Sequence, residues 1–470
     1  MTETKTKELV IIGGGPGGYA AAFRAADLGL QVTLIDPEVN PGGVCLYRGC
    51  IPSKALLHVA KTKEEAQKAA AWGLEFDPPK IDLVKTAKWK DGVVKKLIEG
   101  LGQLTKARDI NYIQGKAKFT GGKELEVTQK DKKTKTITFK NAIIATGSSV
   151  KTLPRIDVDH DKVWDSTDAL SLKKVPRKML VIGGGYIGLE LGSVFAALES
   201  KVSVAEMTAG FLPNTDRDLV KVFENNHPFE KLYLNTKVEK LKINKSDVSV
   251  TLKGKDEEQT KKFDVVLVAV GRKPNTQNLG LGNVGISSNE NGFIDVNPQR
   301  KTPNDHIYAI GDITGGPMLA HKASHEGRVA AEAIAGKKGA GYDPKAIPAI
   351  VFTNPELAWC GLSEKEAKEK NKAIKVAKFP WSASGRALAI GENSGFTKLI
   401  IDSKTETILG GSAAGKGAGS LIPEIALAIE MGSTASDISL TIHPHPTLSE
   451  TIMESAEHIL GGATHLSKQL

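Results

Sequence analysis

Cysteine is scarce in this chain: only Cys45, Cys50 and Cys360 occur among 470 residues. A framework of several structural disulfides is therefore excluded. A structural zinc site usually takes four Cys or His ligands, and His58 is the only histidine near the first two cysteines. Zinc stays open as an alternative, but the interpretation we favour is a cysteine pair that opens and re-forms a disulfide.

Long apolar runs and targeting signals are also missing. Residues 9–12 are apolar, but glycines follow at once, and the run is far too short to cross a bilayer. The first residues, MTETKTKELVIIGGG, lack the basic stretch, the apolar stretch and the small-residue cleavage site of a signal peptide. We therefore expect a cytoplasmic protein with no membrane partner, in which a structural disulfide would be unusual.

Aromatic residues make up 5% of the chain and are scattered, although the net charge is +9. The lysine-rich stretches QKDKKTKTITFK (129–140) and KGKDEEQTKKFD (253–264) also contain acidic residues and lie between strand-like runs. A nucleic-acid surface would need basic residues grouped with aromatic ones. We interpret these stretches as solvated hairpin loops and expect no nucleic-acid partner.

Glycine, by contrast, is abundant, and it forms a motif near the start of the chain. In ELVIIGGGPGGYAAAFRAADLGLQVTLID (8–36), Gly13, Gly15 and Gly18 follow an apolar strand and fit G-x-G-x-x-G. An alanine-rich helix over about 17–29 and a second strand over 32–35 come next, and Asp36 ends that strand. This is the strand–helix–strand context in which the motif binds a dinucleotide, with pyrophosphate at the helix N-terminus and ribose on the acid.

The same pattern recurs in KMLVIGGGYIGLELGSVFAALESKVSVAEM (178–207). Gly183, Gly185 and Gly188 follow a strand, and Glu206 ends the next one, 23 positions after Gly183, which is also the spacing from Gly13 to Asp36. Two such units predict two dinucleotide sites. A carboxylate at 206 repels the 2′-phosphate of NADP and accepts from the 2′-hydroxyl of NAD, so we predict NAD at the second site.

Further apolar strands run into glycine at 141–149, 264–275 and 302–313, and each can return the chain to a cofactor. From about residue 346 onward, strands alternate with amphipathic helices. The predicted fold class is α/β, with two Rossmann-like dinucleotide-binding domains and a C-terminal α+β dimerisation domain. We place an FAD-binding domain at 1–148, an NAD-binding domain at 149–275, a central segment returning to the flavin at 276–345 and an interface domain at 346–470.

Taken together, the motifs resemble the dihydrolipoamide dehydrogenase branch of the FAD-dependent pyridine nucleotide–disulfide oxidoreductase family. The resemblance covers nearly the full length. It rests on GGGPGG, GGVCLYRGCIPSKALLH, ATGS, VIGGGYIGLELG, AVGRKPN, AIGD, PMLAHKASHEG and HPHPTLSE. It implies FAD on the first βαβ unit and NAD on the second.

The resemblance also implies roles for individual residues. Lys54 would stand near the flavin and pair with Glu190, and both would be catalytic. The remaining residues expected at FAD are Gly13, Gly15, Gly18, Asp36, Ala117, Gly147, Asp312, Ala320 and His321. Those expected at NAD are Gly183, Gly185, Gly188, Glu206, Val238, Ala269, Gly271 and Arg272.

The geometry of the cysteine pair can be argued directly. A disulfide needs Cα atoms within roughly 6.8 Å, whereas residues five apart on a helix are separated by about 7.5 Å along the axis alone. Cys45 and Cys50 therefore cannot share an ideal helix, and Gly49 can supply a bend. We expect Pro52 to open a helix with Cys50 just ahead of it, where a thiolate is stabilised, and Cys45 outside it. On this arrangement Cys45 meets the substrate and Cys50 meets the flavin.

A second pair of candidate catalytic residues lies in TIHPHPTLSE (441–450). On sequence alone, His443 and His445 could equally be part of an ordinary loop or a stray metal pair. By the resemblance, His445 is the general base and Glu450 orients it. That base serves the cysteines of the other subunit, so the resemblance implies a homodimer with shared active sites.

The predicted activity is NAD-dependent oxidation of protein-bound dihydrolipoamide through Cys45–Cys50 and FAD. The partner would be the lipoyl-bearing acyltransferase of a 2-oxo acid dehydrogenase complex or the lipoyl protein of glycine cleavage. The alternatives are a glutathione- or mercuric-reductase-like enzyme and a mainly structural flavoprotein subunit. We expect no metal. Asp36, Tyr47-Arg48 and Pro444 depart from the usual family pattern, and the net charge of +9 is at odds with an acidic docking face.

Overall fold

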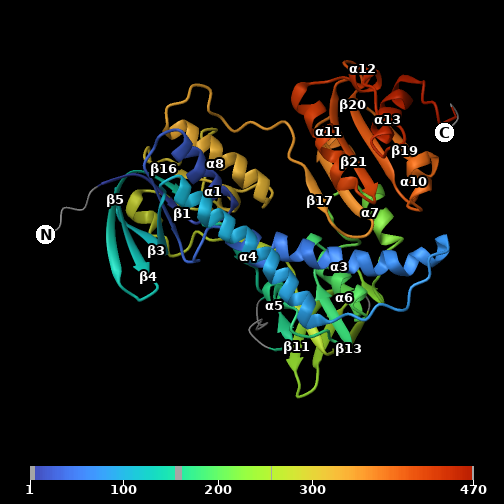
Figure 1. Cartoon of the computed structure of the whole chain (residues 1–470), viewed down its shortest axis with the longest axis horizontal. Helices are drawn as coiled ribbons and strands as arrows, with labels where there is room; N and C mark the ends of the chain where they lie inside the picture. The colour runs from blue at the N-terminus through green and yellow to red at the C-terminus, as the bar shows by residue number, and fades with distance from the viewer. Residues whose placement is uncertain (1–5, 154–160, 256, 468–470) are drawn as a thin grey trace.

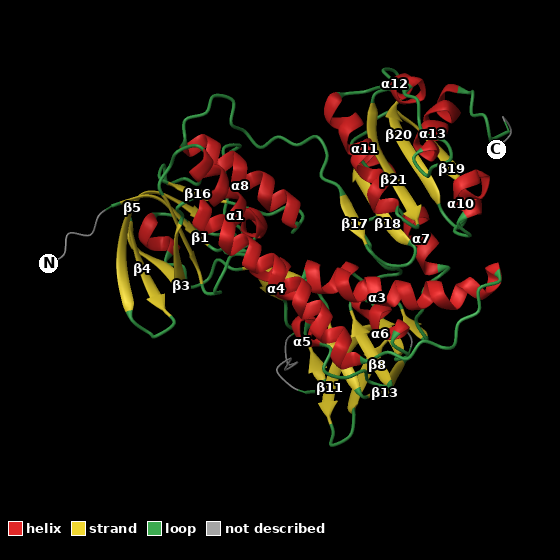
Figure 2. Ribbon diagram, viewed as in Figure 1, coloured by secondary structure: helices red, strands yellow, loops and turns green. Residues whose placement is uncertain are grey.

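The computed structural model describes residues 6–153, 161–255 and 257–467. The molecule has three regions, each built around a β-sheet (Figure 1, Figure 2). Two of them repeat one plan, in which a five-stranded parallel sheet carries helices on one face and a smaller antiparallel sheet on the other. The third is antiparallel and lies at the C-terminal end.

The first region has a parallel sheet in the order β3-β2-β1-β5-β16. Its last strand comes from far along the chain, so the segment at 276–345 returns to this region. The elements are β1 (Lys7–Ile12), α1 (Pro16–Asp27), β2 (Val32–Asp36), β3 (Asn111–Gly121), β4 (Glu124–Gln129), β5 (Thr134–Ile144), η2 (Leu281–Val284), β16 (Ile307–Ala309), η3 (Gly311–Thr314) and α8 (Ala320–Ile334).

The two faces of this sheet are covered differently. Leu9 and Ile11 of β1 pack on the side of α1 and α8, while Val10 and Ile12 pack on the side of the antiparallel sheet β3-β4-β5. A strand buried on both faces is apolar throughout, which is why residues 9–12 could be predicted as a strand. The helix and second strand of the motif are also where we predicted them.

A helical excursion separates β2 from β3 and reaches the second region. It contains α2 (Gly43–Arg48), α3 (Cys50–Lys68), η1 (Ala69–Trp72) and α4 (Leu83–Ala107). The long helices α3 and α4 cross the middle of the molecule (Figure 1), and α3 packs against α6 of the second region. The residue that begins α3 therefore stands where the two regions meet.

The second region has the parallel order β10-β9-β8-β14-β7 and the antiparallel sheet β11-β12-β13. A two-stranded ribbon, β6 with β15, links it to the first region. The elements are β6 (Ser148–Val150), β7 (Val163–Trp164), α5 (Ser166–Ser171), β8 (Lys178–Ile182), α6 (Tyr186–Ala197), β9 (Lys201–Ala205), α7 (Arg217–Glu224), β10 (Lys231–Tyr233), β11 (Lys237–Ile243), β12 (Val248–Lys253), β13 (Glu258–Phe263), β14 (Val265–Val268) and β15 (Arg272–Pro274).

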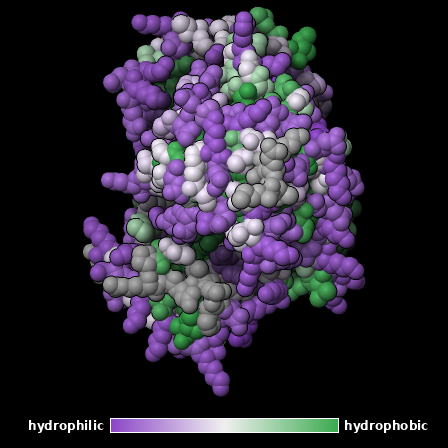
Figure 3. Space-filling model, turned by 90° about the vertical axis from the view of Figure 1, so that its left-hand side faces the viewer, coloured by the Kyte–Doolittle hydropathy of each residue, from purple (hydrophilic) through white to green (hydrophobic). Residues whose placement is uncertain are grey.

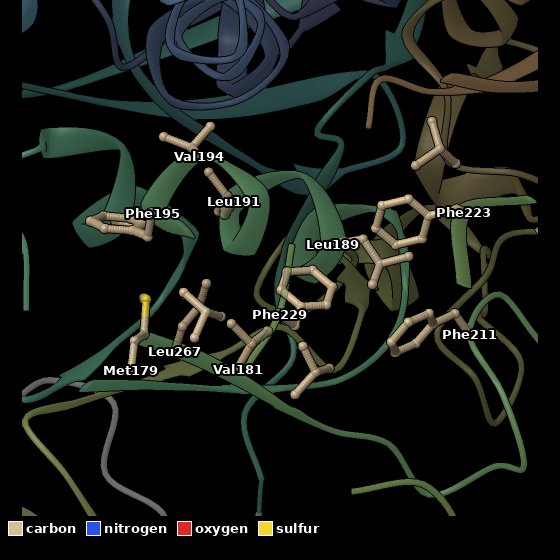
Figure 4. Packing of buried hydrophobic residues seen from close by; sticks show 14 of the residues in the cluster. Met179, Val181, Leu189, Leu191, Val194, Phe195, Phe211, Phe223, Phe229 and Leu267 are labelled. Atoms are coloured by element: carbon tan, nitrogen blue, oxygen red, sulfur yellow. The ribbon is translucent and has the colours of Figure 1, made fainter. Parts of the chain in front are cut away.

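The core of the second region lies between its parallel sheet and α6 (Figure 4). Leu189 and Phe195 of α6 point at strand residues such as Val181, and a trio of aromatic rings closes one end. That trio is Phe211, Phe223 and Phe229. Because α6 is apolar on most of its surface, Glu190 is an exception: its carboxylate is buried in the same helix.

The third region is an antiparallel sheet in the order β17-β18-β21-β20-β19, covered by α11 and α13. The predicted alternation of strands and helices is confirmed. The elements are β17 (Ala349–Val351), β18 (Glu356–Gly361), α9 (Glu364–Glu369), β19 (Ile374–Pro380), η4 (Trp381–Ala383), α10 (Gly385–Ala389), β20 (Phe396–Asp402), β21 (Ile408–Gly415), α11 (Ala418–Met431), α12 (Ala435–Leu440) and α13 (Glu450–Leu460).

The two lysine-rich stretches lie in β-hairpins, as predicted, but most of their residues belong to strands β4, β5, β12 and β13 rather than to loops. Asp256, within the second stretch, lies outside the described residues. The face of the molecule that carries the first of these hairpins is largely hydrophilic (Figure 3). Of the helices that the structure describes, none combines the length and the apolar character needed to cross a membrane.

Candidate active site

The glycines of each motif stand where a side chain would not fit or where the chain faces open space. Gly13 and Gly183 have φ of +107° and +110°, and a Cβ on either would lie within 2.4 Å of the carbonyl oxygen of the residue that follows the neighbouring strand, Ala145 or Ala269. A Cβ on Gly18 would lie 1.8 Å from the oxygen of Gly13, so helix α1 could not approach β1. A Cβ on Gly185 would meet nothing within 4 Å. These are the separate roles expected of the glycines in a dinucleotide-binding turn: one for the tight turn, one for the approach of the cofactor and one for close packing of helix and strand.

The acids at the ends of β2 and β9 face the glycine turns. Asp36 accepts a hydrogen bond of 2.5 Å from the amide of Gly14, and Glu206 accepts one of 2.7 Å from the amide of Gly184. Burial raises the pKa of Asp36, and the amides of Glu38 and Gly14 act in the opposite direction. The second oxygen of Asp36 accepts from the amide of Glu38 at 2.9 Å, and that of Glu206 accepts from the amide and hydroxyl of Thr208 at 2.8 and 2.9 Å. The position of each acid, at the end of the second strand and facing the glycine turn, matches the ribose-binding acid of the motif.

A cavity of about 720 Å³ opens beside the first glycine turn. It is lined by seven of the residues predicted at FAD or in its turn: Gly13, Gly15, Asp36, Ala117, Gly147, Asp312 and Ala320. Cys45 and Cys50 line it too. The cavity lies within the range of about 300–1,000 Å³ typical of ligand sites. A cavity lined by the motif glycines and by two of the acids predicted at FAD, Asp36 and Asp312, suits an extended dinucleotide such as FAD.

The structure corrects the expected position of the cysteines. Helix α3 begins at Cys50, not at Pro52. Cys45 lies outside α3, as predicted, but inside a separate short helix, α2. Pro52 fits because the first turn of a helix has amide groups with no partner, so a missing N–H costs little. Gly49 separates the two helices, and a Cβ there would stand 2.8 Å from the carbonyl oxygen of Val44. The expected bend is present, but it joins two helices.

The two thiols differ in acidity. The pKa of Cys50 is lowered to about 7 because Cys45 donates a hydrogen bond to its thiolate and Lys54 adds positive charge, although burial opposes both. The pKa of Cys45 is raised, first by that hydrogen bond, then by burial and by the negative charge of Cys50. Cys50 is therefore the thiolate of the pair. Cys360 is buried, and burial raises its pKa to about 12, as suits an inert core residue.

Lys54 and Glu190 form the pair that the motifs implied. Lys54 Nζ lies 2.7 Å from Glu190 Oε2 and 4.7 Å from the centre of the Phe352 ring. The carboxylate of Glu190 is 3% exposed and also accepts from Ser53 Oγ and from the amide of Phe352. Its three donors come from two other regions of the molecule, so this carboxylate ties all three regions together close to Cys50.

Asp312 has partners that sequence reasoning missed. Ser148 Oγ donates to Asp312, and Arg272 donates from Nε to Ser148 Oγ at 2.7 Å. Arg272, predicted along the NAD groove, also lines the FAD cavity. Ser148 belongs to the ATGS motif, but nothing in that motif indicates a link to residue 312, because their contact depends on the pairing of β5 with β16.

The remaining predicted residues lie outside the cavity lining. Val238 is on β11 and packs on the antiparallel-sheet side of the second region. His321 is exposed, and its Nε2 lies 2.8 Å from the carbonyl of Pro348. Ala269 and Gly271 lie beside the second glycine turn, after β14. Tyr186, not predicted, begins α6 and is near enough to Arg272 and Asp312 for their charges to act on its hydroxyl.

His445 and Glu450 are in contact, as predicted. His445 Nδ1 lies 2.8 Å from Glu450 Oε1, and the other oxygen of Glu450 accepts from the amide of Thr447. Glu450 begins α13. His443 instead bonds Glu424 through Nε2 at 2.7 Å. The His445 side chain is 74% exposed, and no residue beyond Ala323 lines the cysteine cavity in the part of the chain that the structure describes.

Comparisons with known proteins agree with this geometry. Residues 7–327 match the family described as pyridine nucleotide-disulphide oxidoreductase, and residues 347–456 match the dimerisation domain of that family. The chain is 49% identical to a dihydrolipoyl dehydrogenase of Haemophilus influenzae, covering 99% of this chain and 97% of that one. It is 50% identical to a dihydrolipoyl dehydrogenase of Buchnera aphidicola, covering 97% of each chain.

Solved structures resemble the whole chain as well. LpdA from Mycobacterium tuberculosis superposes with a TM-score of 0.90 at 26% identity, over 97% of this chain and 100% of that one. The HOCl-induced flavoprotein disulfide reductase RclA from Escherichia coli superposes with a TM-score of 0.84 at 30% identity, over 96% and 99%. The paired glycine turns, the cysteine cavity and these matches show that the chain belongs to the pyridine nucleotide–disulphide oxidoreductase family.

Proposed function

We propose that this protein is a dihydrolipoyl dehydrogenase, which oxidises protein-bound dihydrolipoamide to lipoamide and reduces NAD. Its cofactors are FAD and NAD. The observation that carries the proposal is the cysteine pair in one cavity, with the thiolate at Cys50, beside residues that fit FAD. The carboxylate of Glu206 at the second site supports NAD over NADP. A glutathione- or mercuric-reductase-like enzyme and a mainly structural subunit remain the alternatives to be tested.

The residues divide the reaction between them. His445, oriented by Glu450, takes a proton from one thiol of the substrate, and the thiolate attacks Cys45 to form a mixed disulfide and release Cys50 as a thiolate. The second substrate thiol closes the lipoamide ring and releases Cys45, which takes up the proton. Lys54, held by Glu190, stabilises the negative charge on Cys50. When bound, FAD supplies the chemistry that passes two electrons from the reduced Cys45–Cys50 pair to NAD.

We infer that the enzyme is a homodimer in which each His445 serves the cysteines of the partner. His445 is exposed and does not line the cysteine cavity of its own chain. Beside it, on α11 and α12 and just after α12, large apolar side chains are exposed: Leu427, Met431, Leu440 and Ile442. An apolar surface of this kind usually marks an interface. The further partner is a lipoyl-bearing acyltransferase or glycine-cleavage lipoyl protein, and the site of action is the cytoplasm.

The activity is tested by two steady-state assays run side by side. We expect NAD-dependent oxidation of dihydrolipoamide and much slower NADPH-dependent reduction of glutathione disulfide. The Cys50→Ser variant should lose the lipoamide reaction and the long-wavelength absorption band of a thiolate beside flavin. Activity only with NADPH and glutathione disulfide would overturn the assignment, as would normal lipoamide turnover by Cys50→Ser.

Sharing of the active site is tested by mixing subunits. Cys50→Ser and His445→Gln homodimers are each expected to be inactive. Random re-association of the two should restore about a quarter of the wild-type activity, since half of the dimers are mixed and each mixed dimer has one intact site. No recovery in verified mixed dimers would show that His445 serves its own chain.

A further inference from the structure

The two residues that precede Gly49, between the redox cysteines, both reach back to the segment that follows Asp36. Tyr47 Oη donates to the carbonyl of Asn40 at 2.9 Å and accepts from its amide at 3.3 Å. The guanidinium of Arg48 forms an ion pair with Glu38. Helix α2, which carries Cys45, is thus fastened at two points to the loop between β2 and α2.

This ion pair stands in the wall of the FAD cavity. Arg48 and Glu38 both line it, together with Asp36 at the end of β2 and the two cysteines. The charge of Arg48 also acts on the Asp36 carboxylate. Arg48 is therefore next to the acid that the motif assigns to the adenosine ribose, while its backbone belongs to the helix of Cys45.

The guanidinium has donors to spare. Arg48 uses Nη2 for Glu38, and its other N–H groups make no hydrogen bond to any residue that the structure describes. Its side chain lines the cavity and is 40% exposed. A planar guanidinium with free donors is the group best suited to bind phosphate or ribose oxygens.

We propose that Arg48 is a binding residue for the adenosine diphosphate half of FAD, and that Glu38 is a positioning residue that orients the guanidinium. The ion pair holds the Arg48 side chain in the cavity lining, where it binds this half of the cofactor. Because Arg48 is on α2, this contact also links the adenosine site to the helix of Cys45. Cofactor retention and the position of the redox helix are then coupled through one side chain.

The test measures how fast FAD leaves the holoenzyme, from the rise of flavin fluorescence after dilution. Arg48→Val should release FAD about tenfold faster, and Arg48→Lys, which keeps the charge but not the fork, about threefold faster, as expected for loss of a charge-assisted contact. Glu38→Gln should give an increase of about threefold, because Arg48 loses its orientation. Circular dichroism checks that each variant is folded.

A matched control is Arg108→Val. Arg108 forms an ion pair with Asp27 at 2.8 Å and lies over the Phe23 ring in the same region, but it does not line the cavity. Its loss should leave the FAD release rate unchanged. If Arg48→Val releases FAD no faster than wild type, or no faster than Arg108→Val, the proposal is overturned.

A charge exchange separates binding from mere structural support. In the double variant Glu38→Arg/Arg48→Glu, an ion pair can re-form, but the guanidinium no longer stands on α2. Because Arg48 contacts the cofactor in the proposal, FAD release should stay fast in this variant. Recovery of the wild-type rate would show that the pair only braces the loop, and would overturn the proposal.

Discussion

At the scale of single residues, the chemistry depends on what surrounds each thiol. Cys50 is at the first position of α3 with Lys54 one turn on, while Cys45 is in the middle of α2 and more buried. The helix N-terminus and the ammonium both favour a thiolate at Cys50. The two cysteines, on adjacent helices, are thereby given different tasks.

This difference predicts a pH profile. In Cys45→Ser, which leaves one thiol and keeps a hydroxyl donor, the thiolate–flavin absorption band should be half developed near pH 7, because the pKa of Cys50 is lowered to about 7. Cys45→Ala removes the donor, so its midpoint should lie higher. In the double variant Cys45→Ala/Lys54→Met the midpoint pH should be higher still, because the positive charge of Lys54 is lost as well. A midpoint that is the same in all three variants would contradict this account of the thiolate.

The pair His445–Glu450 predicts a second result. Glu450→Gln leaves the shape of the loop but removes the charge that orients and supports the base. We expect kcat for dihydrolipoamide to fall about 10²-fold with little change in the thiolate–flavin band. Glu424→Gln, at the neighbouring His443, is the matched comparison and should have a much smaller effect. Equal losses in both variants would argue against a special role for Glu450.

Which residue contacts could be predicted depends on their distance along the chain. Cys45 and Cys50 are separated by one bend, so their proximity follows from spacing. His445 and Glu450 are also close in sequence, but their pairing was reached through the family resemblance. The link from Ser148 to Asp312 joins residues 164 positions apart and needs the sheet to exist first. The pair of Lys54 with Glu190 was reached only through the family resemblance.

At the scale of elements, the two βαβ units could be predicted because the strands of each are mostly buried and therefore mainly apolar. Helix α2 could not. It has six residues, too few to show a periodic pattern, and its start at Gly43 depends on a φ of +57° close to Gly15. The start of α3 lies two residues before the predicted one, because a proline fits several positions of a first helical turn and does not fix where the helix begins.

Gly49 gives a prediction at this scale. Gly49→Ala puts a methyl group 2.8 Å from the carbonyl oxygen of Val44, at the junction of α2 and α3. The helices must move apart, so re-formation of the Cys45–Cys50 disulfide after reduction should slow markedly, as measured by thiol titration over time. Gly92→Ala, on the exposed helix α4 with open space around it, is the control. It should stabilise the fold by roughly 0.5–1 kcal/mol. Unchanged disulfide kinetics in Gly49→Ala would show that the junction is looser than the structure indicates.

At the scale of the whole molecule, a buried lysine joins the second and third regions. Lys398 on β20 has a fully buried side chain, and its Nζ lies 2.8 Å from Asp216 and from Glu364 and 3.1 Å from Asp218. Burial lowers the pKa of Lys398, but the hydrogen bonds that it donates to Asp216 and Glu364 outweigh this and the net shift is upward. Sequence reasoning could not find this contact, because Asp216 and Asp218 are 182 and 180 positions from Lys398 in the sequence, and Glu364 is 34 positions from it.

Removing Lys398 leaves three carboxylates facing one another. Lys398→Met should therefore destabilise the protein by about 3–5 kcal/mol, measured by urea unfolding at fixed protein concentration. Lys378→Met is the control. It removes the half-exposed partner of Asp218 and should cost about 0–1 kcal/mol.

The same cluster sets a pH dependence. Burial raises the pKa of Asp218, but Lys378 and Lys398 outweigh it and the net shift is downward. Its contribution to stability is full above the ordinary carboxyl pKa of about 3.9 and is lost as the pH falls through the lowered value. The difference between wild type and Lys398→Met should accordingly shrink in acid. A difference that is independent of pH would rule out an ionic origin.

The shared carboxylate of Glu190 has a consequence for biosynthesis. Its donors are Ser53 and Lys54, made early, and the amide of Phe352, made about three quarters of the way along the chain. Domains fold in order as a chain emerges from the ribosome. A nascent chain can thus build both glycine turns and the cysteine bend before it can complete the setting of Lys54. The reactive thiolate acquires its full surroundings only when the third region has folded against the other two, so the growing chain is spared a fully activated thiol until it is nearly finished.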